Sequence, residues 1–311
     1  MECIKSMGKE TRCDFVVTEK RKKLWRVELE ILCEIERICE KYNLQYFALG
    51  GASIGAIRHK GFIPWDDDLD IGMTRKDLDF LLKVAPKELP EYYYIDYGVK
   101  NNNSFNGFCR IRDSRTTGIL RADMENNSNG GIFVEIYPYD KLSSNKYKRR
   151  LQIAVSNYLY TALTVKCYKE RVHLSMAKRI ILLPMRMLTT QKIWNLFDEN
   201  CRKYNGLESA IVVDTVSLPQ YAKQNKYYYK IEDVQRCYKM KFEETEIRVP
   251  NNLKKYLTIQ YGNYMEFPPI EERGRHHENI VFYDPDKSYT EYYGKQCLKD
   301  FFKVESKIIG S

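Results

Sequence analysis

The residues best suited to chemistry form one acidic run, Asp66-Asp67-Asp68-Leu69-Asp70. Side chains alternate between the two faces of a strand, so a strand through this run projects Asp68 and Asp70 to the same side. Two carboxylates on one face repel each other unless a cation lies between them. Mg²⁺ commonly takes one or two carboxylates and leaves its other positions to water and phosphate. We therefore predict a Mg²⁺ site that handles phosphate, with Asp66 as a third acid; an acidic turn without a ligand is the alternative interpretation.

A glycine turn and a group of cations precede the acids. Gly50 and Gly51 make a turn in front of Ser53, whose hydroxyl begins a predicted short helix over 53–58 with amides suited to phosphate. The cations that follow are donors for phosphate oxygens or ordinary surface charges. Apolar residues bracket the acids and indicate the edge of a core, where an uncompensated charge is costly. The candidate substrate-binding residues here are Gly50, Gly51, Ser53, Arg58, His59, Lys60 and Trp65.

Helices and strands alternate up to about residue 141 and must position these groups. Apolar residues at three-and-four spacing predict a helix over 19–42, and a short apolar run predicts a strand over 46–49. Thr74 with Asp77 three residues later predicts the capped start of a helix that Pro86 ends. Further strands are expected at 93–97, 108–112 and 131–137, the last stopped by Pro138.

The pattern changes in the second half of the chain. Long helical stretches, broken near Pro184, are expected over about 145–210, and a strand at 246–249 precedes a helix over 253–261 that Gly262 closes. We therefore divide the chain into a catalytic core (1–143), a mostly helical basic region (144–245) and a C-terminal segment that packs back on the core (246–311).

Composition and charge exclude several classes of protein. With 311 residues, 43% of them hydrophobic, the chain can bury a large core and is neither disordered nor collagen-like. Nine scattered cysteines without a C-x-x-C pair argue against a disulfide framework and predict a reducing, cytoplasmic location. Residues 146–192 hold eleven basic residues against one acidic residue, a block suited to anionic lipid such as the inner face of a membrane, to nucleic acid or to a phosphorylated substrate. A solvated helical face is the alternative.

Motifs around the acids resemble those of a known family. Gly-Gly-x-Ser followed by Asp-hydrophobic-Asp resembles the signature of the nucleotidyltransferase superfamily. The longer string GAIRHKGFIPWDDDLDIGM, residues 55–73, is similar to the LicD family of phosphocholine transferases, to which the fukutin-type sugar phosphotransferases are related. The segments 112–116, 131–140 and 261–265, with Arg273 and His276, are also similar. Glu135 departs from the family, which commonly has Asp there, and Ala52-Ser53-Ile54 replaces a Thr-Leu-Leu run.

The resemblance implies an α+β fold, with a nucleotidyltransferase-like mixed sheet flanked by helices and an additional helical layer. It implies transfer of phosphocholine, or a similar phospho-alcohol, from CDP-choline or another CDP-alcohol to a hydroxyl of a cell-surface or lipid-linked glycan such as lipopolysaccharide, with release of CMP. Mg²⁺ is the expected cofactor, and no nucleic-acid partner is expected. A nucleotidyltransferase that uses a nucleoside triphosphate, and a non-catalytic basic protein that binds membranes or nucleic acid, are the alternatives. The donor alcohol and the acceptor stay open.

The resemblance also suggests roles for single residues. Asp68 and Asp70 would hold Mg²⁺, and Glu135 would be a third ligand or the base that accepts the proton of the acceptor hydroxyl. Quaternary ammonium groups are held by aromatic faces, for which Trp65, Tyr137 and Tyr139 are candidates, although the apolar run around Trp65 favours core packing for that residue. The remaining candidate contacts to phosphate or acceptor are Arg112, Arg273 and His276.

Overall fold

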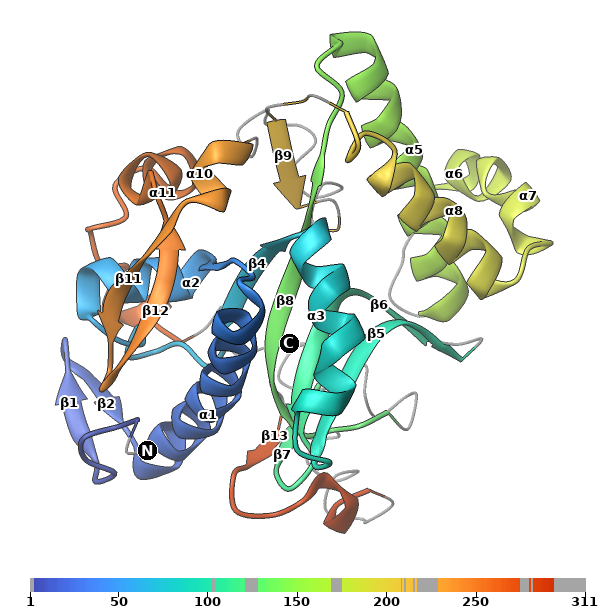
Figure 1. Cartoon of the computed structure of the whole chain (residues 1–311). Helices are drawn as coiled ribbons and strands as arrows, with labels where there is room; N and C mark the ends of the chain where they lie inside the picture. The colour runs from blue at the N-terminus through green and yellow to red at the C-terminus, as the bar shows by residue number, and fades with distance from the viewer. Residues whose placement is uncertain are drawn as a thin grey trace.

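The computed structural model describes residues 3–101, 104–120, 128–168, 175–207, 209, 211–214, 216, 229–274, 280 and 282–293. Figure 1 shows a curled mixed sheet flanked by helices, so the predicted α+β class is confirmed. The strands of this sheet are β3 (Tyr46–Ala48), β4 (Asp70–Thr74), β5 (Tyr93–Asn101), β6 (Ser104–Asp113), β8 (Ile132–Lys141), β9 (Ile211–Asp214) and β10 (Tyr229–Lys230).

Strand β8 is the centre of the sheet. It pairs in parallel with β4 on one side and antiparallel with β6 and then β9 on the other. The expectation that Pro138 stops this strand is wrong. Pairing with β6 ends at Ile136 and pairing with β9 begins at Tyr139, so Pro138 falls in the gap, where its missing amide costs the ladder nothing.

Helices α1 (Glu19–Tyr42) and α3 (Arg75–Glu88) are among those that contact strands of this sheet. Helix α1 has the predicted bounds: the Thr18 hydroxyl accepts a hydrogen bond from the Arg21 amide, and Asn43 ends the helix in the left-handed conformation. Thr74 caps α3 as predicted, but Pro86 lies inside its last turn instead of ending it.

The segment around the acids differs from its prediction. Helix α2 (Gly50–Ile54) begins three residues earlier than expected and continues into a π-helical stretch, η1 (Gly55–His59). Strand β4 begins only at Asp70, so Asp66 and Asp68 lie on the preceding loop. The loop forms because the Asp66 carbonyl accepts hydrogen bonds from the side chains of Trp25 and Arg21 on α1 instead of from a neighbouring strand.

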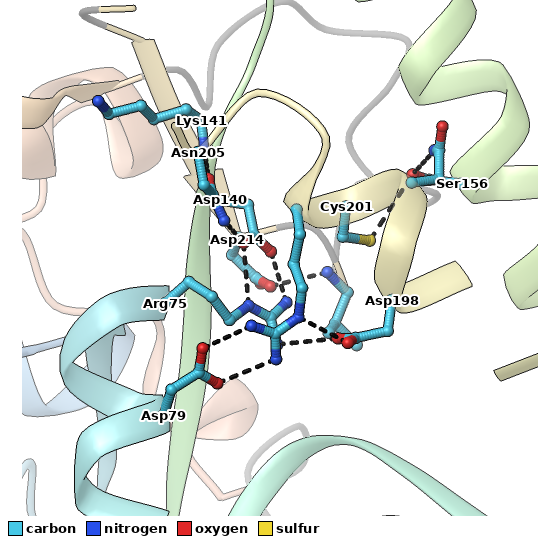
Figure 2. A network of polar contacts seen from close by, with 12 residues as sticks. Arg75, Asp79, Asp140, Lys141, Ser156, Asp198, Cys201, Asn205 and Asp214 are labelled. Carbon is cyan, nitrogen blue, oxygen red and sulfur yellow. Dashed lines mark hydrogen bonds and ion pairs between the residues drawn. The ribbon is translucent and has the colours of Figure 1, made fainter. Parts of the chain in front are cut away.

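A helical layer with its own core follows β8, as expected. It contains α5 (Lys146–Cys167), α6 (Met176–Ile181), α7 (Leu183–Arg186) and α8 (Thr190–Arg202). A polar network fastens this layer to the sheet (Figure 2). Arg75 at the start of α3 donates to both carboxylate oxygens of the buried Asp140 on β8, and it also contacts Asp198 on α8. Asn205, just after α8, donates to Asp140 as well.

The C-terminal part packs against the main core. Helix α10 (Ile231–Gln235), the hairpin β11 (Cys237–Phe242) and β12 (Thr245–Pro250), and α11 (Leu253–Tyr261) supply buried residues such as Val249 and Leu257 to the same apolar cluster as Ile35 of α1. Smaller pieces are β1 (Glu10–Arg12) with β2 (Phe15–Val17), β7 (Thr117–Ile119) with β13 (Phe282–Asp284), and two short 3₁₀ turns, η3 (Ile270–Glu272) and η4 (Tyr289–Glu291). The division into three domains stays a prediction.

Candidate active site

The pairing of β4 with β8 places two of the candidate acids side by side. Asp70 is the register partner of Glu135 in this parallel pair. Residues two apart on a strand share a face, so Glu135, Tyr137 and Tyr139 project to one side of β8. This face of the sheet therefore carries two neighbouring carboxylates followed by two tyrosines.

Carboxylates crowd the loop before β4 as well. One carboxylate oxygen from each of Asp66, Asp67 and Asp68 lies within 4.8 Å of the others. Burial and the charge of Asp70 hold the pKa of Asp68 well above its usual range, and burial and the charge of Glu135 do the same for Asp70. Both shifts mean that the ionised acids need a positive charge nearby.

Helix α1 adds a further buried acid behind the loop. Glu28 is completely buried, and neither of its carboxyl oxygens has a hydrogen-bond partner within the described ranges. Burial, with Asp67 and Asp66 close by, raises the pKa of Glu28 well above its usual range. Glu28 is therefore a buried carboxyl group close to the acidic loop whose ionised form is disfavoured.

Glu135 is an oriented carboxylate on the central strand. Arg110 on β6 donates to its Oε1 at 2.8 Å, and the Tyr137 hydroxyl donates to its Oε2 at 2.7 Å. Arg110 is the register partner of Glu135 across the β6–β8 pair. The two bonds fix the direction of the carboxylate and keep a balancing positive charge next to the acids.

The glycine turn meets the acids directly, but the serine does not. A Cβ atom at Gly51 would lie 2.1 Å from a carboxylate oxygen of Asp66, so only glycine allows this approach. Gly50 adopts a positive φ of 46° and donates its amide to the Tyr256 hydroxyl at 3.4 Å. Ser53 is completely buried, and its hydroxyl donates to the Ala48 carbonyl. In this structure the hydroxyl is therefore bonded to the backbone and is not exposed to a phosphate.

Several predicted phosphate contacts instead hold the C-terminal segment in place. Arg58 donates to the Tyr264 and Glu266 carbonyls, and Arg273 donates to the Pro268 and Cys13 carbonyls. His59 stacks on Phe267 and meets the edge of Trp65, which is 1% exposed. Burial and the nearby Arg58 lower the pKa of His59 to about 4, so this histidine is neutral near pH 7. Arg58, His59, Trp65 and Arg273 therefore pack together, and Arg58 is also close enough to Asp66 to interact with it electrostatically.

The remaining candidates are Arg112, Lys60 and His276. Arg112 is completely buried, with its guanidinium bonded to the Gly131 carbonyl and 3.6 Å from Asp96. Lys60 is exposed at the end of the π-helical stretch. His276 lies outside the described residues.

The donor set fits Mg²⁺. Every ligand that the acids offer is a carboxylate oxygen, which Mg²⁺ prefers. The Oδ1 atom of Asp70 is buried and has no hydrogen-bond partner in the described part of the chain, which leaves it available to a cation. Asp66, Asp67 and Asp68, whose carboxylate oxygens lie close together, and Asp70 are therefore the residues that could hold the ion, with Glu135 beside Asp70.

The part of the chain that contains the acids is similar to known proteins. Residues 43–152 match the family model described as the nucleotidyltransferase domain of LicD, FKTN and FKRP. Residues 43–152 therefore resemble a LicD-type nucleotidyltransferase domain. It is 28% identical over 260 residues to the lipopolysaccharide cholinephosphotransferase LicD of Haemophilus influenzae, a match that covers 80% of this chain and 92% of that protein. An uncharacterized protein of Rickettsia typhi is 28% identical over 117 residues, 38% of this chain and 35% of that protein.

The LicD-family domain contains the acids but not all the residues that support them. Helix α1 precedes the matched range, and yet its residues Arg21, Trp25 and Glu28 lie against the acidic loop. Sequence reasoning passed over Glu28, although its spacing from Leu24 and Ile31 puts a charge on the apolar face of the helix. A charged residue on the apolar face of a helix indicates a buried polar site and could have identified Glu28.

Two other residues were missed for different reasons. Alternation along a strand points Asp67 away from Asp68, so the sequence pattern does not predict Asp67 as a ligand. The loop brings their carboxylates together instead. Arg110 could not be chosen over Arg112, because only the register of β6 against β8 shows which arginine lies opposite Glu135.

Proposed function

We propose that this protein transfers phosphocholine from CDP-choline to a hydroxyl group of a lipopolysaccharide or related glycan. The acceptor oxygen would form a bond to the phosphorus that carries choline, and the bond from that phosphorus to the bridging oxygen would break. CMP would leave with the bridging oxygen, and the proton of the acceptor hydroxyl would pass to a base in the site. No oxidant or reductant is required.

The match to the Haemophilus influenzae cholinephosphotransferase, over 92% of that protein's length, is the observation that carries this proposal. The acids support it independently, since phosphoryl transfer depends on charge stabilisation and in-line positioning more than on covalent chemistry by the protein. Asp68 and Asp70 lie inside the matched domain, as does Glu135.

The acids would divide the work between binding and proton transfer. Bound Mg²⁺ would neutralise phosphate charge during transfer. Asp68 and Asp70 would hold the ion, and Glu135 would complete its ligands or accept the proton of the attacking hydroxyl. Arg110 and Tyr137 orient Glu135 for either role through the two hydrogen bonds described above. Arg110 would also offset the negative charge of the donor.

A nucleotidyltransferase is the second candidate function, because the matched family model is itself described as a nucleotidyltransferase domain. This enzyme would use a nucleoside triphosphate and release pyrophosphate. The two reactions need the same acids and differ in donor and in leaving group.

Peripheral contact with the inner face of a membrane is part of the proposal, because lipid-linked glycans are met there. In the described part of the chain, no helix is long and apolar enough to cross a bilayer. Helix α6 and the end of α7 expose apolar side chains, including Ile180 at 61% and, directly after α7, Met187 at 90%, near the exposed Arg179 and Arg186. Apolar and basic residues together favour anionic lipid surfaces.

Incubation of the purified protein with CDP-choline, Mg²⁺ and a panel of lipopolysaccharides tests the function. We expect acceptor-dependent CMP release and a phosphocholine mass added to the glycan, and we expect Asp68→Ala to abolish both. Asp286→Asn, a change at an acid 55% exposed, is the matched control. Pyrophosphate release from CTP without CMP release from CDP-choline would favour the nucleotidyltransferase instead.

A further inference from the structure

A cavity of about 130 Å³ lies next to Asp70, between β4, β8, β9 and helix α11. We infer that this cavity holds the quaternary ammonium group of the donor alcohol. The inference rests on the proposed function and adds the part of the protein that recognises the transferred group. Its basis is the aromatic, anionic lining of the cavity and its position beside the acids.

The lining is unusually aromatic. Five tyrosines contribute to the wall, and three of them form a continuous row of rings: the ring centroids of Tyr139 and Tyr229 are 6.0 Å apart, and those of Tyr229 and Tyr256 are 4.9 Å apart. A cation without N–H groups cannot donate conventional hydrogen bonds, but it is attracted to the faces of such rings. The other two tyrosines of the wall are Tyr137 and Tyr261.

The charge of the lining has one sign. Asp70 and Asp214 contribute carboxylates, and none of the residues that the structure places in the wall is Lys, Arg or His. When Asp70 holds a metal ion, Asp214 remains as the anionic partner. It lies opposite Tyr139 in the β8–β9 pair and accepts a hydrogen bond from the Val216 amide. A wall of this charge favours a cation over the phosphates of a nucleotide.

Size and position agree with a trimethylammonium group. The cavity is far larger than the roughly 10–15 Å³ that one water needs and is close to the roughly 150 Å³ of a cavity that takes benzene. Choline joins its nitrogen to the phosphate oxygen through only two carbons, so its ammonium must lie beside the phosphate. Asp70 belongs to both the acid cluster and the cavity wall, and Gly50 lines the wall as well.

Calorimetry with the full chain tests the site without turnover or metal. The probes are choline, tetramethylammonium and 3,3-dimethyl-1-butanol, which has the shape of choline without its charge. We expect the two cations to bind and the neutral alcohol to bind at least about tenfold more weakly, since a desolvated cation–π contact is worth about 2 kcal/mol. Equal binding of choline and the neutral alcohol would overturn the inference.

Tyr261 offers a matched pair of variants because it is 47% exposed at the end of α11, where a change leaves the core intact. Tyr261→Leu removes the π face and should weaken choline binding by about 2–30-fold, the range that corresponds to 0.5–2 kcal/mol. Tyr261→Phe keeps the face and should bind like the natural protein. Asp214→Asn should weaken choline binding and leave the neutral alcohol unaffected.

The same variants separate this inference from the proposed function. Tyr261→Leu should weaken binding of CDP-choline and leave binding of CMP unchanged. An equal loss for CMP would assign the cavity to cytidine and overturn the inference, and so would unchanged binding of both ligands. If the protein binds choline as expected but does not consume CDP-choline with any acceptor tested, the assignment of the cavity is supported. The proposed transferase function is then refuted.

Discussion

Substitution of Asp70 by Asn should stabilise the protein in the absence of metal and remove its response to Mg²⁺. The Oδ1 atom of Asp70 is buried without a hydrogen-bond partner among the described residues, and Glu135 is its register partner on β8. A buried unsatisfied group costs about 1–3 kcal/mol, and more when it is charged. Asparagine removes the charge and supplies an N–H donor beside Glu135, so we expect a gain of about that size.

The direction in which this stability difference changes with pH follows from the raised pKa of Asp70. Below the unfolded pKa of about 3.8, the carboxyl is protonated in both states and costs no stability. As the pH rises towards the folded pKa, the unfolded state releases its proton first, so the natural protein loses stability that Asp70→Asn retains. The difference in melting temperature between the two proteins should therefore be larger at pH 7.5 than at pH 5.

Differential scanning fluorimetry with and without Mg²⁺ measures both effects. A gain of 1–3 kcal/mol corresponds to several degrees for a chain of this size, at about 2–4 °C per kcal/mol. Mg²⁺ at one hundred times its dissociation constant should stabilise the natural protein by about 2.7 kcal/mol and the variant hardly at all. Asp286→Asn should keep the full response. The proposed metal site is refuted if the melting temperature of Asp70→Asn without metal is no higher than that of the natural protein and if Mg²⁺ raises both melting temperatures equally.

Three further changes test the framework around the site. Asp140→Ala removes the buried carboxylate partner of Arg75 and leaves its contact with the more exposed Asp198, so urea denaturation should show a loss of up to about 3–5 kcal/mol, and an unchanged midpoint would contradict the role given to this pair. Gly72→Ala places a methyl group 2.6 Å from an aromatic ring of β3; we expect a loss of about 1–3 kcal/mol in the same assay, and a stable variant would mean that the ring moves aside. Arg179→Glu should weaken sedimentation with anionic vesicles while Lys87→Glu, on the distant helix α3, should not; equal behaviour of the two would remove the support for membrane contact.

Local signals predicted the parts of the fold that local chemistry determines. The apolar spacing of α1 and the cap at Thr74 depend only on neighbouring residues, and both were predicted correctly. The strand prediction was wrong at Asp66, where the chain forms a loop. The hydrogen bonds that hold this loop come from Trp25 and Arg21, about forty residues earlier in the chain. No pattern within the run itself contains that information.

The site was predictable in part for the same reason. The sequence placed Glu135 on a strand near the acids, but only register shows that it lies opposite Asp70 and is held by Arg110. The cavity beside Asp70 draws Tyr256 and Tyr261 from almost two hundred residues further along the chain. Arg58 and Arg273 were plausible phosphate ligands by charge, and their bonds to backbone carbonyls emerge only in the folded chain.

Calorimetric titration of the protein with CDP-choline, CDP-ribitol, CDP-glycerol and CTP, each with and without Mg²⁺, tests the central claim most directly because it requires no acceptor. The acid cluster and the anionic tyrosine cavity predict Mg²⁺-dependent binding with CDP-choline preferred over the other three ligands. A preference for CTP, or no binding of any CDP-alcohol in the presence of Mg²⁺, would contradict the claim that this protein is a phosphocholine transferase.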